Sequence, residues 1–389
     1  MDSLVADLLN ATRRVTGPGE LPLHEPLFGE LESKLILETI ASTMVSSVGP
    51  QISEFEDLIK RFTGSRFAVA TVNGTTALQV ALLCSGLERG DEVLVPSLTF
   101  AATASAVVHA GGTPVFMDSD PERIGLDPYI VRTWLEANTK VTKKGTINST
   151  TGNRIHSIIP VHIFGHPVDI DAFTQVSTDF GLDIVEDAAE SLGSYYKEKH
   201  TGTFGTVGII SFNGNKTITT GGGGVLLTNN EDIALRARHK ITTAKISHPW
   251  EYIHDGIGFN FRLPNLNAAL GVAQMQNLTK VVELQRRLFE KYTSELDAIE
   301  GIKLISEPSD SRSNYWLQAV ILDRNISHLR DEILEEFNKD GLKVRPTWRP
   351  LHLLTPYSGF QRSSMSGTEE IYSRLVNLPS SPRLAQGSK

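Results

Sequence analysis

"GIISFNGNKTITTGGGGVLLT", residues 208–228, decides the fold class of this chain. Two β-rich apolar runs, GIISFN (208–213) and GVLLT (224–228), enclose a small, hydroxyl-rich segment that holds one lysine, Lys216, and ends in four glycines. A surface lysine does not need such a neighbourhood, whereas a lysine that acts as a nucleophile or contacts a phosphate does. The stretch therefore indicates a strand that ends at a chemical site.

Five further β-rich runs precede this stretch and alternate with helical segments. The runs are RFAVATV (66–72), DEVLVP (91–96), TPVFMD (113–118), HSIIPVHIF (156–164) and LDIVED (182–187). The helical segments are TTALQVALLCSGL (75–87), TFAATASAVVHAGG (99–112) and DIDAFTQVSTDFG (169–181), the last opened by Asp169 as an N-cap. This alternation is typical of an α/β fold whose parallel sheet is covered on both faces. We therefore predict a mostly parallel seven-stranded sheet.

The pattern changes after about residue 267, where long amphipathic helices begin. A strand, SNYWLQAVIL (313–322), and a helix, HLRDEILEEFNKDG (328–341), follow. We predict three parts: an N-terminal segment (1–40) that packs on the small domain, a large domain (41–267), and a linking helix with a smaller α+β C-terminal domain (268–389). Within them, the polar stretch 140–154 is expected to be a surface excursion and LAQGSK (384–389) a disordered tail.

Composition limits the classes of function. The chain has 389 residues, is 40% hydrophobic and carries a formal net charge of −8, which argues against nucleic-acid binding. The single cysteine, Cys84, excludes an internal disulfide and a cysteine-based metal site, and we expect no metal. Because MDSLVADLLNATRR lacks a signal-peptide pattern and no run approaches 18 apolar residues, we expect a cytoplasmic protein.

Ligands of such sheets bind at the carboxyl ends of the strands, so the residues after each strand are the candidate site. Gly74, Thr75 and Thr76 begin a helix whose free N–H groups can bind one phosphate, although an ordinary N-cap turn has the same sequence. Phe100 follows another strand, and its ring can lie flat against a planar ligand or simply fill the core.

A third junction, IVEDAAESLGS, delivers two acids. Strand alternation makes Glu186 and Asp187 point to opposite sides, so one of them faces the site. That carboxylate can bind a metal, act as a base or pair with a protonated ring nitrogen. The alternative is that Asp187 caps a helix and Glu190 completes a capping box.

The fourth junction holds Lys216. A phosphate-loop NTPase motif requires a glycine directly before the lysine, but Asn215 stands there and the glycine spacing is wrong. A lysine that forms a Schiff base with an aldehyde cofactor fits better, since it needs a low-charge pocket and glycines that let the backbone approach a planar ring. A phosphate cup, a flat aromatic ring, a carboxylate and such a lysine are together the parts that hold pyridoxal 5′-phosphate (PLP).

The chain closely resembles the sugar-nucleotide aminotransferases of PLP fold type I, also called the DegT or StrS family. The resemblance runs from LPLHEPLFGE to VNLPSSP and includes NGTTAL, VEDAAESLGS and GFNFRLPNLNAALG in the family's order. It implies that Lys216 forms the Schiff base and that Asp187 pairs with the pyridine nitrogen. It further implies the following contacts: Phe100 on the ring, Thr75, Thr76 and Ser211 on the phosphate, and Glu190 beside the cofactor hydroxyl. It also implies a homodimer with shared active sites, in which Asn260 and Arg262 reach the partner's cofactor phosphate.

Within the family, HEPLF, VSSVG, FGHPVDID and TTAKISHPWEYIHD look most like the 4-aminotransferases of the legionaminic acid and bacillosamine pathways. That resemblance implies ping-pong transfer of the amino group of L-glutamate to C4 of UDP-2-acetamido-2,6-dideoxy-hexos-4-ulose. Since related dehydratases replace the lysine with histidine, Lys216 favours transamination. A 3-aminotransferase and a catalytically idle PLP-fold sensor are the alternatives. Candidate sugar contacts, each equally consistent with ordinary packing, are His24, Glu25, His166 and the WRPLH segment (Trp348 to His352).

Overall fold

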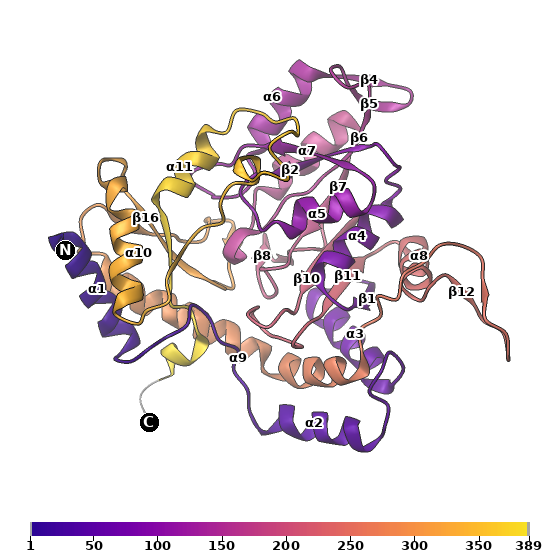
Figure 1. Ribbon diagram of the computed structural model, residues 1–389, viewed down its shortest axis with the longest axis horizontal. Helices are drawn as coiled ribbons and strands as arrows, with labels where there is room; N and C mark the ends of the chain where they lie inside the picture. The colour runs from indigo at the N-terminus through magenta and orange to yellow at the C-terminus, as the bar shows by residue number, and fades with distance from the viewer. Residues whose placement is uncertain (1, 387–389) are drawn as a thin grey trace.

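The computed structural model describes residues 2–386, and its centre is a nine-stranded sheet (Figure 1). Seven strands follow the order β1-β11-β10-β7-β6-β2-β3. They are β1 (Phe67–Thr71), β2 (Glu92–Pro96), β3 (Thr113–Met117), β6 (Arg154–Ile158), β7 (Asp183–Asp187), β10 (Val207–Ser211) and β11 (Gly224–Thr228). The four pairs from β10 to β3 are parallel, and β11 is antiparallel to both β10 and β1. All seven predicted strands and their mostly parallel arrangement are therefore confirmed, and the sheet has two strands more than predicted.

The remaining two strands form a hairpin where the sequence predicted a surface excursion without assigning it any strand. β4 (Thr139–Thr142) pairs with β5 (Gly145–Asn148), and β5 extends the sheet by pairing antiparallel with β6. The prediction missed the hairpin because its strands are polar. Its register places Thr146 and Asn148 in the interior, while the residues around the turn stay exposed.

Helices cover both faces of this sheet. One face carries α4 (Gly74–Ser85), α5 (Ala102–His109) and α8 (Glu231–Ile241), and the other α3 (Pro50–Thr63), α6 (Pro128–Asn138) and α7 (Ile170–Phe180). Successive residues of β2 alternate between the two cores, with Val93 and Val95 in one and Leu94 in the other. Asp169 caps α7 by accepting a hydrogen bond from the Ala172 N–H, as predicted.

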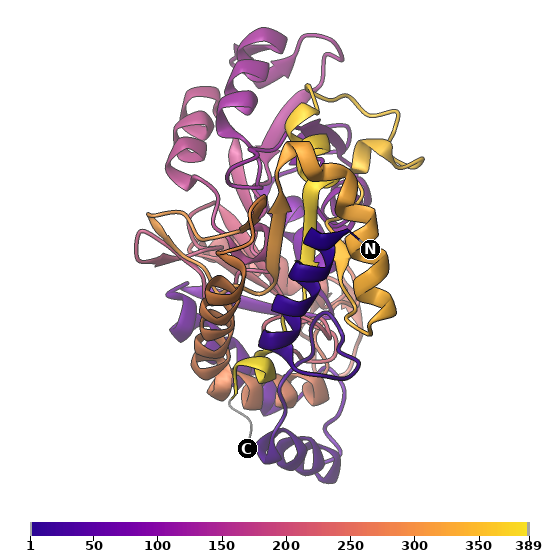
Figure 2. The same ribbon diagram turned by 90° about the vertical axis from the view of Figure 1, so that its left-hand side faces the viewer.

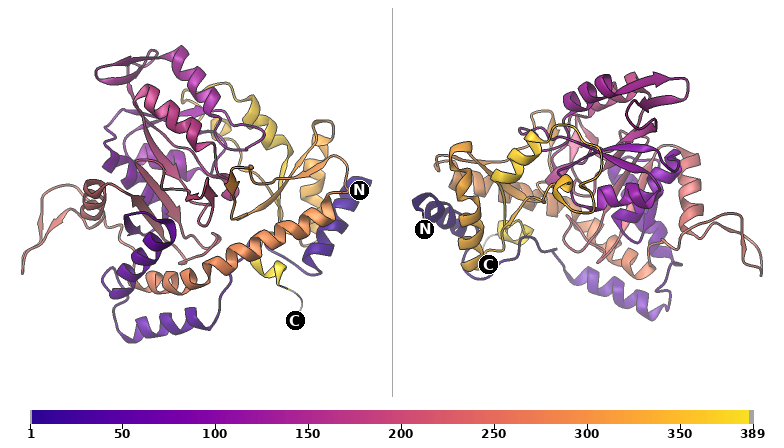
Figure 3. Two further views of the ribbon diagram at one scale, coloured as in Figure 1. Left: turned by 180° about the vertical axis from the view of Figure 1, so that it is seen from behind. Right: turned by 45° about the horizontal axis from the view of Figure 1, so that its top comes forward.

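A single long helix, α9 (Asn265–Leu296), joins the two parts of the molecule (Figure 3). Its first half buries Ala268, Val272 and Met275 against α3 and the central sheet. Its second half buries Leu288 and Tyr292 in a separate core with the C-terminal elements. The C-terminal elements are β14 (Ile302–Leu304), β16 (Gln318–Leu322), α10 (Arg330–Lys339), β17 (Arg345–Pro346), α11 (Ser366–Arg374) and β18 (Leu375–Leu378), of which α11 buries Ile371 in a core of the central sheet. Their strands form a four-stranded sheet in the order β14-β16-β18-β17.

The two N-terminal helices lie in different places. α1 (Ser3–Thr16) packs beside α10 and the second half of α9 (Figure 2), whereas α2 (Glu30–Ala41) lies along the first half of α9, away from the small sheet. At the other end, Leu384 and Ala385 are buried in the same core as α1. The expected disorder of the tail is thus wrong for these two residues, and residues 387–389 lie outside the described part of the chain.

A long arm projects from the large domain after α8 (Figure 1). It carries the short hairpin of β12 (Lys245–Ile246) and β13 (Ile253–His254), with Trp250, Tyr252 and Ile257 more than three-quarters exposed at its surface. Small strands β8 (Tyr195–Tyr196), β9 (Lys199–His200) and β15 (Ser311–Arg312) form a separate sheet that joins the large domain to the C-terminal part. Within residues 2–386, no helix combines the length and apolarity needed to cross a membrane.

Candidate active site

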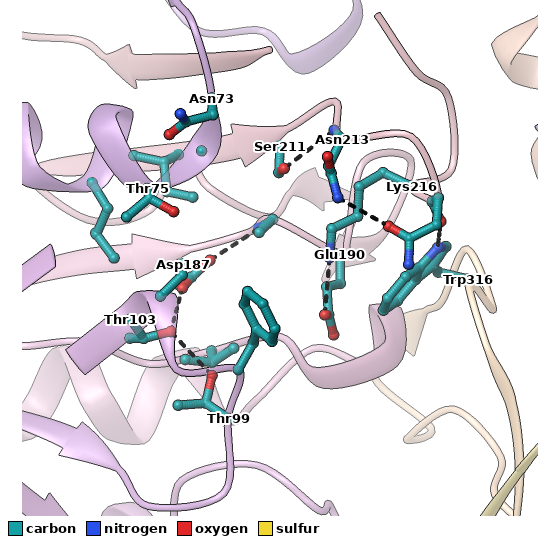
Figure 4. Close-up of a pocket in the computed structure, with 18 of the residues that line it drawn as sticks. Asn73, Thr75, Thr99, Thr103, Asp187, Glu190, Ser211, Asn213, Lys216 and Trp316 are labelled. Carbon is teal, nitrogen blue, oxygen red and sulfur yellow. Dashed lines mark hydrogen bonds and ion pairs between the residues drawn. The ribbon is translucent and has the colours of Figure 1, made fainter. Parts of the chain in front are cut away.

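A pocket of about 330 Å³ opens at the carboxyl ends of β1, β2, β6, β7 and β10 (Figure 4). Of the sequence-predicted residues it is lined by Gly74, Thr75, Phe100, Asp187, Glu190, Ser211 and Lys216. These residues come from loops up to about 140 positions apart, and only the shared direction of the parallel strands brings them together. Thr76, Asn260 and Arg262 are not among the lining residues.

The start of α4 forms one wall of the pocket. Asn73 caps the helix by accepting a hydrogen bond from the Thr76 N–H (2.8 Å), and the Thr76 hydroxyl donates back to the Asn73 carbonyl, so Thr76 points away from the pocket. The first N–H groups of a helix have no intrahelical acceptor, and here Gly74 and Thr75 at the start of α4 line the pocket together with Ser211. This wall can bind an anion.

The four glycines have a different role from the predicted one. None of them lines the pocket. A Cβ added at Gly224 would collide with the backbone of Asn73 and Gly74, and a Cβ at Gly74 would lie 2.9 Å from the Ser211 Cβ. Gly224 and Gly74 thus allow β11 and β10 to pack directly against the turn that begins α4, which sets the anion-binding wall.

Asp187 ends β7 and faces the pocket. Its Oδ2 accepts a hydrogen bond from the Thr103 hydroxyl (2.9 Å), and its Oδ1 accepts one from the Ala189 N–H (3.2 Å). Burial raises the pKa of Asp187, against the lowering effect of these two hydrogen bonds. No helix follows within residues 188–194, so the alternative of a helix N-cap is excluded.

Glu186 points to the opposite side of β7, as strand alternation predicted. It is fully buried and bonds His162 (3.2 Å) and the N–H groups of Gly202, Phe204 and Gly205 (2.6–2.8 Å). Burial acts to raise the pKa of Glu186, but the hydrogen bonds lower it overall. The chain itself therefore provides two hydrogen-bond partners for each oxygen of the Glu186 carboxylate.

Lys216 lies between a carboxylate and an aromatic ring. Its Nζ is 3.0 Å from Glu190 Oε1 and 4.1 Å from the ring centroid of Trp316. The second carboxylate oxygen of Glu190 accepts a hydrogen bond from the Phe164 N–H (2.9 Å), so the predicted capping box does not form. Burial raises the pKa of Glu190 above its usual value, although the nearby Lys216 ammonium acts in the opposite direction. The expected low-charge surroundings of Lys216 are thus wrong, because this ion pair supplies charge.

Phe100 lies just before α5, which begins at Ala102, and its side chain does not pack in the core. It is 59% exposed and lines the pocket. An exposed ring at the mouth of a polar pocket has free apolar surface for a planar ligand.

Comparison with known proteins identifies the family. The sequence profile of the DegT/DnrJ/EryC1/StrS aminotransferase family matches residues 27–388. The chain belongs to this family.

Individual relatives agree with this assignment. GDP-perosamine synthase of Escherichia coli O157:H7 is 32% identical, over 94% of each chain. The spore coat polysaccharide biosynthesis protein SpsC of Bacillus subtilis is 29% identical, over 94% of this chain and 93% of its own. The crystal structure of a DegT/DnrJ/EryC1/StrS aminotransferase from Brucella abortus superimposes with a TM-score of 0.81 at 28% identity, over 90% of each chain. The predicted enzyme class, a PLP-dependent sugar aminotransferase of PLP fold type I, is confirmed.

The pocket of this DegT-family enzyme fits PLP. The free N–H groups at α4 and the Ser211 hydroxyl suit its phosphate, and the exposed Phe100 ring suits its planar ring. Asp187 is a buried carboxylate whose pKa is raised because burial disfavours its negative charge. A protonated ring nitrogen beside it would stabilise that charge. Lys216 is the sole Lys or Arg among the pocket residues that the structure describes, so it is the candidate for the amine that would bind the aldehyde.

Several pocket residues have no counterpart in the sequence prediction. Thr103 bonds Asp187 and itself contacts the Thr99 hydroxyl (3.0 Å), and Trp316 lies against Lys216. Thr103 stands in an Ala/Ser/Thr-rich helix start that carries no distinctive motif. Trp316 lies 100 residues from Lys216 in a predicted strand, so its position depends on how the C-terminal part docks on the pocket.

The candidate sugar contacts differ in where they lie. Trp348 lines the pocket and packs on the Phe164 ring (5.1 Å). His24 and His166 are buried, with pKa values lowered by burial to about 3 and about 4, and neither lines the pocket. The two remaining candidates have partners elsewhere: Glu25 pairs with Arg383, and His352 contacts Ser97 and Glu369.

Proposed function

We propose that this enzyme transfers the amino group of L-glutamate to C4 of a nucleotide-linked 4-keto-6-deoxy sugar. The observation that carries the proposal is the convergence of Lys216, Asp187 and the start of α4 on one pocket. Amination at C4 is supported by GDP-perosamine synthase, whose product is a 4-amino GDP sugar. From the sequence we propose UDP-2-acetamido-2,6-dideoxy-hexos-4-ulose as the acceptor, with a GDP-linked sugar as the alternative.

The bound PLP supplies an electron-withdrawing ring that carries the amino group between the two substrates. Lys216 holds the cofactor and then moves the proton that each half-reaction transfers, at its Nζ. Asp187 keeps the proton on the ring nitrogen, and the Thr103 hydroxyl orients the carboxylate for this task. Because the amino group would stay on the enzyme-bound cofactor while 2-oxoglutarate leaves and before the sugar binds, we expect ping-pong kinetics.

Glu190 has a complementary task. When Lys216 is not bound to the cofactor, the carboxylate 3.0 Å from its Nζ keeps the amine in the pocket and takes part in proton exchange. The Phe164 N–H holds the other carboxylate oxygen, which fixes the orientation of Glu190.

The visible absorption spectrum of the protein with PLP, recorded before and after L-glutamate, tests the cofactor half of the proposal. We expect a band of protein-bound PLP that disappears when glutamate is added. A band that glutamate leaves unchanged would favour another donor or the idle PLP-fold sensor. Nucleotide-linked 4-keto and 3-keto sugars carrying UDP, GDP or dTDP are then screened as acceptors. Turnover of 3-keto sugars alone would replace C4 by C3 amination.

Substitution of the lysine tests its role. Lys216→Ala should lower turnover by at least about 10³-fold, since it removes both the covalent attachment and the proton carrier. Lys280→Ala, at an exposed position of α9, is the control and should keep full activity. Substantial activity of Lys216→Ala would contradict the assignment.

We further propose a homodimer with shared active sites. Apolar side chains of α2 and the segment after it are exposed, among them Leu37, Met44 and Val48. Arg262 lies at the base of the arm, and its Nε is buried without a hydrogen-bond partner. This supports a role for Arg262, and for the neighbouring Asn260, in the partner's site.

Mixing two inactive variants tests this sharing. If Arg262 serves the partner's pocket, a mixed dimer of Lys216→Ala and Arg262→Ala holds one complete site, and random mixing restores about a quarter of the activity. No recovery after mixing, with dimers present by light scattering, would contradict the shared site.

A further inference from the structure

Residues 313–316, Ser-Asn-Tyr-Trp, reach from the small domain to the loops that carry Glu190 and Lys216. The segment directly precedes β16 of the small sheet. Asn314 is fully buried, and its Nδ2 donates hydrogen bonds to the carbonyls of Glu190 and Leu192 (both 2.9 Å) and to the Thr217 hydroxyl (3.1 Å). One side chain thus joins both loops to the small domain.

Trp316 completes the connection at the lysine itself. Its Nε1–H donates a hydrogen bond to the Asn215 carbonyl (2.7 Å), one residue before Lys216. Its ring centroid lies 4.1 Å from the Lys216 Nζ, and the side chain is almost fully buried. Figure 4 shows Trp316, Lys216 and Glu190 together at one end of the pocket, away from Asp187 and Thr103.

The backbone of the segment is strained, and its surroundings hold it there. Tyr315 has φ of 49°, which is uncommon for a residue with a side chain. Its N–H donates to the Ser313 hydroxyl (3.0 Å), and its ring stacks on Phe289 (4.1 Å between centroids). Next to it, a Cβ added at Gly165 would collide with Asn314 Oδ1. Strain of this kind persists only where neighbouring contacts fix it, and it is concentrated at functional sites.

We propose that Trp316 is a positioning residue for Lys216. Its ring face attracts the ammonium group but accepts no proton, so it can hold the protonated Lys216 in place until Glu190 or a substrate group takes the proton. Its N–H fixes the backbone beside the lysine. Both contacts come from the small domain, which makes the placement of the amine depend on the docking of that domain. The proposal rests on the proposed role of Lys216 as the cofactor-binding lysine.

The first experiment establishes which lysine binds the cofactor, with wild-type protein. In the attachment reaction the deprotonated lysine nitrogen bonds to the aldehyde carbon of PLP and one water leaves. Borohydride reduction then makes the bond permanent, and peptide mass spectrometry locates it. Modification of a lysine other than Lys216 would overturn the proposed function itself, and with it this inference.

The second experiment compares Trp316→Leu, Trp316→Phe and the control Trp134→Phe. Trp134 lies in α6, in the core between α6, α7 and the central sheet. The control substitution therefore also removes one indole, but far from Lys216. For each folded variant, the rate of PLP attachment is measured by visible absorption and the affinity for pyridoxamine phosphate by titration. The amine form of the cofactor needs no bond to the lysine, so its affinity reports on the pocket alone.

We expect Trp316→Leu to slow attachment about tenfold, equal to about 1.4 kcal/mol, while the affinity for pyridoxamine phosphate stays within about twofold of wild type. Trp316→Phe keeps a ring face and should slow attachment about threefold. Attachment rates equal to those of Trp134→Phe would overturn the inference. A parallel loss of pyridoxamine phosphate affinity would also overturn it, since Trp316 would then shape the cofactor pocket rather than position the lysine.

Discussion

The two sides of β7 at its carboxyl end hold adjacent carboxylates in opposite surroundings. Glu186 is enclosed by His162 and three backbone N–H groups, which lower its pKa although it is fully buried. Asp187, the next residue, has two hydrogen bonds and a pKa that burial raises. The difference lies in the number of donors that the protein itself provides. A structural carboxylate is fully hydrogen-bonded by its own chain, while the carboxylate on the pocket side keeps capacity for a cationic ligand.

Among changes at Glu186, Asp187 and Thr103, Asp187→Asn should give the largest effect, and this effect is on activity. Turnover should fall about 10²–10³-fold, because the amide cannot stabilise a proton on the cofactor ring. The free protein should be as stable as wild type or more so, since a buried charge is removed. Kinetics and thermal unfolding measure the two effects. Asp183→Asn, at the other end of the same strand, is the control and should keep its activity.

Glu186→Gln should have the opposite profile. Each carboxylate oxygen accepts two hydrogen bonds, so the amide nitrogen must face donors in either orientation. We expect a loss of about 3 kcal/mol in the free energy of unfolding, with the activity of the folded fraction retained. Denaturant titration with activity measurements checks this. A stable but inactive variant would show that both sides of β7 serve catalysis.

The pH dependence of stability should report on the raised pKa of Asp187. The folded-state pKa of Asp187 is raised, so its contribution to stability is complete below its unfolded value and is lost as pH rises through the folded value. The advantage of Asp187→Asn over wild type should therefore grow as pH rises above about 4, in the absence of cofactor. Added PLP should reduce this advantage by supplying the cationic partner. Thermal unfolding with and without PLP measures it, and a pH-independent difference would contradict the assignment.

Among the changes at Glu186, Asp187 and Thr103, Thr103→Val should have the smallest effect. It removes one of the two hydrogen bonds to Asp187 and leaves the carboxylate in place. We expect turnover to fall about tenfold, since a hydrogen bond to a charged group contributes about 1.5 kcal/mol or more. Thr103→Ser retains the hydroxyl and should restore most of the activity. Equal rates for the valine and serine variants would mean that the hydroxyl does not orient Asp187.

The large domain was predictable because its signals are local. Each strand appears as an apolar run, and the parallel order brings the residues after the strands to one edge, where Asp187, Ser211 and Lys216 meet. Alternation along β7 separated Glu186 from Asp187 but could not tell which of the two faces the pocket. That choice depends on donors contributed by residues 202–205, which pattern does not reveal.

The contact that the small domain makes with the pocket through Trp316 was not predictable in the same way. Trp316 was assigned to a strand, which in fact begins only at Gln318. Its contact with Lys216 depends on an unusual backbone angle at Tyr315 and on the side chain of Asn314, neither of which has a sequence signature. Glu190 was expected beside a cofactor hydroxyl or in a capping box, and its pairing with Lys216 needed the folded loop to be seen.

The core around the second half of α9 contains residues from both ends of the described chain, Val5 and Leu8 from α1 and Leu384 and Ala385 from the C-terminal turn. During synthesis, the large domain can pack most of its core once the first half of α9 has emerged from the ribosome. The small domain cannot complete its core until residue 385 has been made, so the part of this core that Leu384 and Ala385 cover stays open until then. Truncation of even the last described turn should therefore affect the yield of soluble protein before it affects catalysis.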